Sequence, residues 1–265
     1  MAGGITRFIV IRYIMNSLLR PLKTESLKEV FIKRFEELII SGHFPIGSRL
    51  PSERELSNLL GVSRPVVHEG LVDLSSKGLV TMIPRVGTLV NDYRSQGSLT
   101  ILNSLLSYHE GSLEPNILES MLRMRMLFEI ETARLAARNR TENHLDEFRT
   151  ILEQERNCDQ SDPELTADLD FRFHHTIAIA SGNVIYPLLI NSFRQVYTNI
   201  TGKFFTDTTL AGAVFSYHDK LVHAISEMDE DVAVAIMTTL LEHGEKYLKA
   251  IISQEHGGHH EHSNS

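Results

Sequence analysis

Asp170 and His174 are a pair of residues whose types and spacing suggest chemistry. Residues four apart lie on one face of a helix, so a carboxylate and an imidazole would point in the same direction here. Both groups are ligands for zinc, nickel or manganese. The same spacing also fits a simple ion pair along a helix. The pair therefore indicates either part of a metal site or a structural contact within one helix.

A second candidate lies at Arg64 and His68, which follow the tripeptide Gly61-Val62-Ser63. Glycine permits a sharp bend and serine caps the helix that follows. A helix-turn-helix reads DNA with the N-terminal end of its second helix, where Arg64 and His68 lie one turn apart. The alternative is a structural three-helix unit with solvated arginines.

Two more arginines fit a DNA-binding surface. Arg54 opens the preceding helix, and a helix N-terminus favours phosphate. Arg85 lies at the tip of a predicted hairpin, where it can contact the minor groove or a phosphate. An arginine at the hairpin tip favours the DNA-binding interpretation over the structural one.

Three helices and a hairpin must position these residues. Capping boxes at residues 26–29 and 52–55 predict the starts of two helices, and Gly42, Gly61 and Gly78 end the three helices. The segments LVTMI and GTLV are typical of two short strands around a PRV turn. The apolar residues expected on the buried helix faces are Leu27, Val30, Phe31, Phe35, Leu38, Ile39, Leu56, Leu59, Leu60, Val66, Val67, Leu71, Val72 and Leu74.

From Leu99 onward the pattern indicates helices only. The fold class is therefore mainly α, with an N-terminal winged helix-turn-helix followed by an all-α bundle of six or seven helices. Within the bundle, we expect helical stretches over residues 121–138, 142–156, 163–180, 184–205, 208–228 and 231–254.

Composition limits the class of protein. The chain has 265 residues, 42% of them hydrophobic, which is enough for a core. Its single cysteine, Cys158, excludes an internal disulfide framework and fits a cytoplasmic protein. No apolar run is long enough to span a membrane. The net charge of −8 arises in the C-terminal two-thirds, while residues 23–92 carry nine basic and nine acidic side chains. An acidic total is thus compatible with a basic DNA-binding face.

These observations predict five parts of the chain. We expect an N-terminal extension over 1–22, a winged helix-turn-helix over 23–92, a polar linker over 93–98, a helical effector-binding and dimerisation domain over 99–254, and a disordered tail over 255–265.

The segment PIGSRLPSERELSNLLGVSRPVVHEGLVDLSSKGLVTMIPRVGTLV resembles the winged helix-turn-helix of the GntR family of bacterial transcription regulators. The resemblance implies DNA contacts at a set of residues in both helices and the hairpin. His68 stands where the family usually has arginine, so one fixed charge is replaced by a group whose charge depends on pH. The implied contact residues are Ser52, Arg54, Ser63, Arg64, Pro65, His68, Arg85 and Gly87.

The later segments RMLFEIETARLAA, DLDFRFHHTIAIASGN and YHDKLVHAI resemble the helical effector-binding (FCD) domain of the FadR subfamily. Many members hold a divalent metal with an Asp-x-x-x-His pair and two later histidines. The resemblance implies Asp170, His174 and His218 as ligands. The fourth position is Leu240 without gaps, or His243 after a three-residue shift.

The resemblance also implies an effector contact at Arg125, because a buried arginine can clamp a carboxylate or phosphate with two hydrogen bonds. Glu129, one turn later, offers the alternative of a structural ion pair. Tyr197 is a candidate for lining the pocket. The fatty-acyl-CoA-responsive members resemble the chain most closely, and they lack the full ligand set, which implies an apolar tunnel instead of a metal.

We therefore expect a ligand-responsive bacterial regulator that binds a palindromic operator as a homodimer. Its effector would be a small carboxylic acid, with or without a divalent zinc, nickel or manganese ion.

One alternative is a fatty-acyl-CoA-responsive regulator of lipid metabolism without metal. A metal-dependent hydrolase using Asp170, His174 and His218 is weaker, because no pattern for a nucleophile or general base accompanies them. A helical interaction protein that does not bind DNA is a further alternative. The expectation is thus a protein that is not an enzyme.

Overall fold

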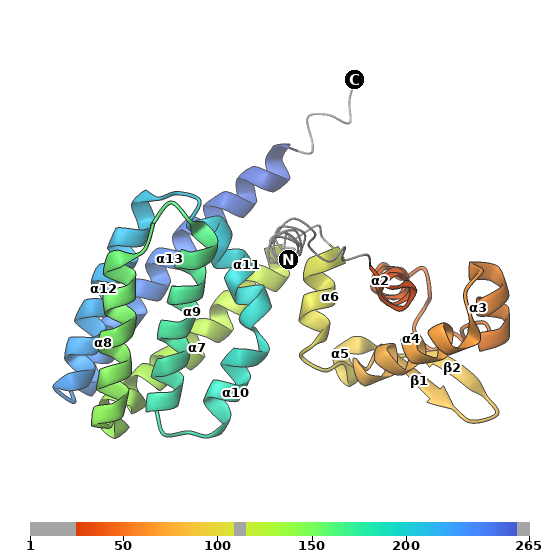
Figure 1. The fold of residues 1–265 in the computed structure, drawn as a ribbon, viewed down its shortest axis with the longest axis horizontal. Coiled ribbons are helices and arrows are strands. Elements are labelled where there is room, and N and C mark those ends of the chain that lie inside the picture. The colour runs from red at the N-terminus through yellow and green to blue at the C-terminus, as the bar shows by residue number, and fades with distance from the viewer. Residues whose placement is uncertain (1–24, 109–114, 259–265) are drawn as a thin grey trace, which may run out of the picture. The chain divides into compact units, whose positions relative to one another are not determined.

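The computed structural model describes residues 25–108 and 115–258, and the chain divides into two compact units, Met1–Asp92 and Tyr93–Ser265 (Figure 1). The expected extension over 1–22 lies outside the described residues, as do residues 259–265 of the expected tail. None of the described helices is both long enough and apolar enough to pass through a lipid bilayer.

The N-terminal unit has three helices and a hairpin. The helices are α2 (Leu27–Ile40), α3 (Glu53–Leu60) and α4 (Arg64–Ser76), and the strands are β1 (Val80–Ile83) and β2 (Gly87–Val90). Capping boxes at Ser26 and Ser52 start α2 and α3. Gly61, with φ of 65°, ends α3 in the left-handed conformation that favours glycine. The expected winged helix-turn-helix is confirmed.

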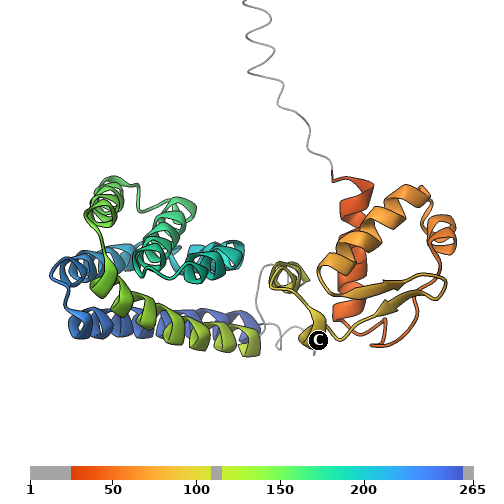
Figure 2. The same ribbon diagram turned by 90° about the horizontal axis from the view of Figure 1, so that it is seen from below.

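The hairpin is antiparallel, with Val80 opposite Val90 and Ile83 opposite Gly87. It packs against α4 (Figure 2). Arg85 has a φ of 64° and is exposed in the turn, so its side chain extends from the tip into solvent.

The core of the N-terminal unit depends on a close approach of α2 to α4. The rings of Phe31 and Phe35 stack with centroids 4.3 Å apart. A Cβ atom at Gly70 would lie 2.3 Å from the Phe31 ring, so only glycine allows this packing. The expectation of burial is wrong for Leu27, Val30, Leu59, Leu60 and Val72, which are exposed because they lie off the buried faces of these short helices.

The C-terminal unit is helical throughout its described part. Its helices are α5 (Tyr93–Gln96), α6 (Ile101–Tyr108), α7 (Pro115–Asn139), α8 (Glu142–Asn157), α9 (Pro163–Ala180), α10 (Ile185–Ser192), α11 (Arg194–Phe204), α12 (Thr209–Ser226) and α13 (Glu230–Gly258). The single helix expected over 184–205 is two helices, because the backbone leaves the helical conformation at Phe193. The expected linker contains α5, and α13 continues four residues beyond 254.

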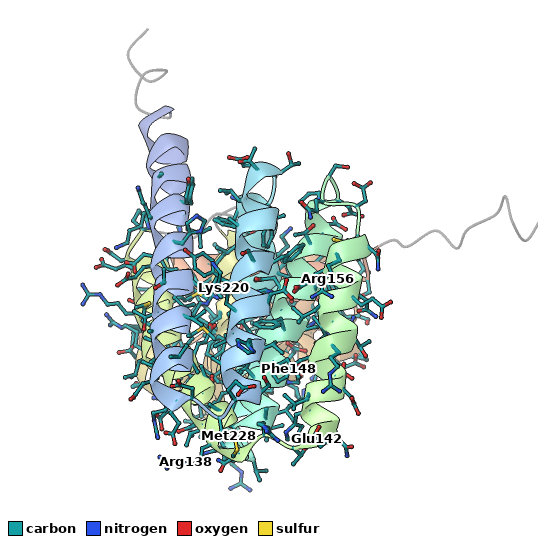
Figure 3. All side chains as sticks on the ribbon, turned by 90° about the vertical axis from the view of Figure 1, so that its left-hand side faces the viewer. Arg138, Glu142, Phe148, Arg156, Lys220 and Met228 are labelled. Carbon is teal, nitrogen blue, oxygen red and sulfur yellow. The ribbon has the colours of Figure 1, made fainter. Side chains whose placement is uncertain are left out.

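The bundle encloses one large apolar core. The labelled Phe148 of α8 points into the interior (Figure 3), where its fully buried ring lies 5.8 Å from that of Phe173. α9 packs against α7, α8, α10 and α11, and α13 packs against α7 and α12. Several charged and polar side chains lie inside this apolar bundle, and they define the candidate site.

Candidate functional site

Asp170, His174 and His218 meet inside the bundle, from α9 and α12. Each is buried, and one ligand atom from each lies within 4.8 Å of the other two. The Nε2 atoms of His174 and His218 lie 3.8 Å and 3.5 Å from the same Asp170 Oδ1. Two ligands of one tetrahedral zinc ion are about 3.4 Å apart, as follows from zinc–nitrogen distances near 2.1 Å. The separations are therefore compatible with ligands that share one ion.

A second carboxylate lies behind each imidazole. His218 Nδ1 is 2.8 Å from Glu155 Oε1 of α8, and His174 Nδ1 is 2.6 Å from Glu129 Oε2 of α7, although without the alignment of a hydrogen bond. A metal-bound histidine usually donates its other N–H to a carboxylate, which fixes the ring. Among the described residues His218 Nε2 has no hydrogen-bond partner. This buried, unpaired nitrogen fits a metal ligand.

The charges around the three residues also favour a cation. Glu129, Glu155 and Asp170 are all buried; Arg125 pairs with Glu129, and Glu155 lies against His218. Burial by itself raises the pKa of Glu129, but Arg125 and His174 lower it to about 2, so it is ionised. Burial raises the pKa of Glu155. Since buried charges require partners, a divalent ion at the three ligands would compensate the negative charge of the ionised carboxylates in this cluster.

The two predicted effector residues are linked to the same cluster. Arg125 Nε donates to Glu129 Oε1 at 2.6 Å, and Arg125 Nη2 donates to Tyr197 Oη at 3.1 Å. Tyr197 donates in turn to Asp170 Oδ2 at 2.6 Å. Burial raises the pKa of Tyr197 well above its ordinary value, so the phenol keeps its proton. The sequence left open whether Arg125 forms an ion pair with Glu129. The structure contains this ion pair, which uses some of the hydrogen-bond donors of the Arg125 guanidinium.

Two cavities meet at Arg125. The larger measures about 280 Å³ and has an almost entirely apolar surface, between α7, α10 and α11. The smaller measures about 40 Å³ and reaches Asp170 and His174. The larger cavity is lined by Leu99, Met121, Met124, Arg125, Phe128, Glu129, Leu189, Ile190, Phe193 and Tyr197. A ligand in either cavity would therefore contact Arg125.

His243, considered as a fourth ligand, is not among the three clustered residues. Its ring lies 5.0 Å from that of Tyr247 and 6.2 Å from that of Tyr217. Leu240 instead lines the small cavity beside Asp170. Residues three apart on a helix point about 60° away from each other, and here the Leu240 side chain is the one that lines the cavity at Asp170 and His174.

Glu155 is the member of the cluster that sequence reasoning did not identify. Its contact with His218 spans 63 residues, which no local pattern reveals. A signal was nevertheless present, because Glu155 follows the buried Ile151 and Leu152 at helical spacing. A carboxylate on the apolar face of an amphipathic helix indicates a buried partner.

Six of the predicted DNA-binding residues lie at or near the starts of α3 and α4. Ser52 caps α3, and Arg54 is exposed in its first turn. Ser63 occupies the N-cap position of α4, but its hydroxyl makes no capping hydrogen bond. Arg64 and Pro65 are exposed in the first turn of α4.

His68 is exposed on α4 but is not free of contacts. Its Nδ1 lies 2.8 Å from Glu53 Oε1 at the start of α3. Sequence reasoning did not find this pair, because the two residues belong to different helices.

The hairpin and the start of α3 line one surface depression of about 430 Å³. Arg85 and Gly87 contribute from the hairpin and Ser52 from α3. Gly87 has a φ of 122°, and a Cβ atom there would lie 2.7 Å from Arg49 Nε. Arg49 is thus held against the hairpin, a position that the sequence did not indicate.

Comparison with known proteins matches a family to each part of the chain. A family described as "Bacterial regulatory proteins, gntR family" matches residues 27–90, and the "FadR C-terminal domain" matches residues 91–254. The HTH-type transcriptional regulator Mce2R of Mycobacterium tuberculosis is 32% identical over 88% of this chain and 96% of its own length. A "Fatty acid metabolism regulator protein" of Yersinia enterocolitica is 31% identical over 70% of this chain and 75% of its own length.

Among solved structures, the Listeria monocytogenes protein Lar has a TM-score of 0.60. Lar controls the expression of the Listeria monocytogenes agr system and mediates virulence. It is 15% identical, covering 86% of this chain and 98% of its own, so it shows a shared fold. Taken with the helix-turn-helix and the helical domain, the two family matches show that the chain belongs to the GntR family of transcription regulators, which bind DNA and are not enzymes, and that it carries the FadR C-terminal domain.

Proposed function

We propose that this regulator binds a palindromic operator as a homodimer and responds to a small carboxylic acid that binds at a divalent metal ion in its bundle. Asp170, His174 and His218 would hold the ion. The observation that carries the proposal is the convergence of two imidazole Nε2 atoms on one Asp170 oxygen, each ring with a second carboxylate at its Nδ1.

The donor set suits zinc, nickel or manganese. Three protein ligands leave room for a further donor, since Leu240 occupies the position at which a fourth imidazole was considered. The bound ion would act as a Lewis acid toward an oxygen atom of the effector. Arg125 lines the small cavity and would orient the rest of the acid.

For DNA, we propose that Arg64, Pro65 and His68 enter the major groove, with Ser52, Arg54 and Ser63 on the phosphates. Arg85 and Gly87 would contact DNA from the hairpin. This assignment is supported by their location, because each of these residues is exposed or lines the depression beside α3. One recognition helix reads few bases, so two copies on two half-sites are needed for useful affinity. Light scattering of the purified protein with and without a palindromic duplex tests the dimer.

Metal content tests the site. Native mass spectrometry of untagged protein should show about one equivalent of metal per chain. His256, His259, His260 and His262 near the C-terminus could bind metal independently, so a variant with all four replaced by serine is the control. Metal that persists in the control but is lost in His218→Ala supports the proposal. A metal-free control with an intact fold would contradict it.

A second candidate is a regulator that responds to a fatty acyl group without metal. The apolar cavity of about 280 Å³ favours it, as does the name of the Yersinia relative. The cavity includes Leu99, which precedes α6, so an apolar ligand would contact the segment that leads into the bundle. Such a ligand could shift the regulator only by binding its two states with different affinity.

The two candidates predict different ligands. If the acyl candidate is correct, an environment-sensitive fatty acid probe should bind to the apolar cavity of wild type. The same probe should not bind to Met124→Trp, in which a larger side chain fills the cavity. A short carboxylic acid that raises the melting temperature only in metal-loaded protein would favour the metal candidate.

A further inference from the structure

The pair formed by Glu53 and His68 determines which hydrogen-bonding atom His68 can present. Glu53 is the first residue of α3, and His68 lies in the second turn of α4. His68 Nδ1 and Glu53 Oε1 are 2.8 Å apart, while the His68 side chain is 55% exposed. One ring nitrogen is therefore engaged within the protein, and the rest of the ring is open to a partner.

A carboxylate can only accept hydrogen bonds. In a neutral His68 ring the nitrogen that faces Glu53 therefore carries the hydrogen, and Nε2 is left as an acceptor. In the major groove the amino groups of adenine and cytosine donate hydrogen bonds, whereas guanine presents acceptors. The pair thus gives residue 68 a defined chemical preference.

The position of Glu53 makes it a suitable acceptor. It lies in the first turn of α3, where unpaired N–H groups and the helix dipole favour a negative charge. The capping box of this helix uses Ser52 and Glu55, which exchange their hydrogen bonds with each other. The Glu53 carboxylate is not needed for the cap and is available to His68.

We propose that Glu53 fixes the tautomer of His68, so that residue 68 selects adenine or cytosine at one position in each half-site of the operator. Glu53 is a positioning residue here, because it acts through His68. An arginine at residue 68 would present donors only and would select guanine. The inference rests on the proposed function, since it requires α4 to lie in the major groove.

The tautomer can be measured without DNA. Nitrogen-15 spectra of the histidine rings in the full-length protein at about pH 8, above the ordinary pKa of histidine, should show His68 with its hydrogen on Nδ1. His68→Gln assigns the signal. In Glu53→Gln the ring should become a mixture, because an amide can donate or accept. A wild-type ring with its hydrogen on Nε2 would overturn the proposal.

The base preference is measured by selection from a pool of random duplexes with the full chain. Wild type should enrich adenine or cytosine over guanine at one position per half-site by about fivefold or more, the equivalent of about 1 kcal/mol. Glu53→Gln should reduce this to less than about twofold. Glu69→Gln is the matched control, because it removes a negative charge from the exposed neighbour of His68, and it should keep the preference.

The outcomes distinguish a failure of the Glu53 role from a failure of the proposed DNA contacts. A selected operator without a preference for an amino-bearing base, or an equal loss in Glu69→Gln, would overturn the role of Glu53 alone. A wild-type protein that enriches no sequence would overturn the proposed DNA contacts and this inference together. Circular dichroism of both variants should match wild type, so that a folding defect is not mistaken for a change in preference.

Discussion

Tyr197 donates a 2.6 Å hydrogen bond to Asp170 and at the same time accepts one of 3.1 Å from Arg125. The phenol therefore links the residue implied as an effector contact to the residue implied as a metal ligand. Arg125 also lies 4.4 Å from the centre of the Tyr197 ring. The metal and effector hypotheses thus concern one connected cluster inside the bundle.

Replacing Tyr197 with phenylalanine should weaken metal binding by about tenfold or more, because partners that orient metal ligands commonly contribute that much. The ring would still cover Arg125. Competition with a chelating dye measures the affinity. Tyr217→Phe, which removes a hydroxyl from the aromatic group around His243, should bind metal like wild type. Equal affinities for the two variants would argue against a metal at Asp170.

Replacing Arg64 with alanine should reduce operator affinity by about tenfold or more, within the range expected for an arginine that contacts a base. The bundle should keep its fold. Fluorescence anisotropy with a labelled duplex gives the affinity. Arg34→Ala removes an exposed arginine from α2 and should have a small effect. If both variants bind equally well, the assignment of α4 as recognition helix is wrong.

Replacing Arg125 with alanine should impair the effector response more than DNA binding. The change removes the guanidinium that pairs with the buried Glu129, and breaking a buried ion pair typically costs about 3–5 kcal/mol, so the variant should also melt at a lower temperature. Arg123→Ala, on the exposed face of the same helix, is the control. Thermal shifts with a panel of carboxylic acids, compared with anisotropy on DNA, separate the two effects. Parallel losses in both assays would make Arg125 a structural residue.

Replacing Gly70 with alanine should destabilise the N-terminal unit by about 1–3 kcal/mol, because a methyl group would overlap the Phe31 ring. Gly212 provides the comparison: it is also in a helix, but its Cβ would meet nothing within 4 Å. Gly212→Ala should stabilise its helix by about 0.5–1 kcal/mol. Urea unfolding of both variants gives the change in the free energy of unfolding. If Gly70→Ala leaves this free energy unchanged, α2 and α4 can move apart without loss of stability, which would contradict the prediction.

The local features of the fold were predictable from the sequence. Capping boxes and left-handed glycines depend on residues three or four apart, so the starts of α2 and α3 and the end of α3 were expected where they lie. The break at Phe193 was not, since no proline or glycine marks it. The exposure of Leu59 and Leu60 was also missed, because an eight-residue helix packs only a narrow face.

The sequence by itself determined the helix-turn-helix and the shared helix face of Asp170 and His174, because spacing within one helix sets which side chains share a face. Its resemblance to the GntR family indicated the class of protein. Only the tertiary structure decided what those side chains meet. Glu155 reaches His218 across 63 residues, and His68 reaches Glu53 across 15. It also placed Leu240 rather than His243 at the small cavity. Such contacts depend on how helices pack and rotate against each other, which local periodicity does not specify.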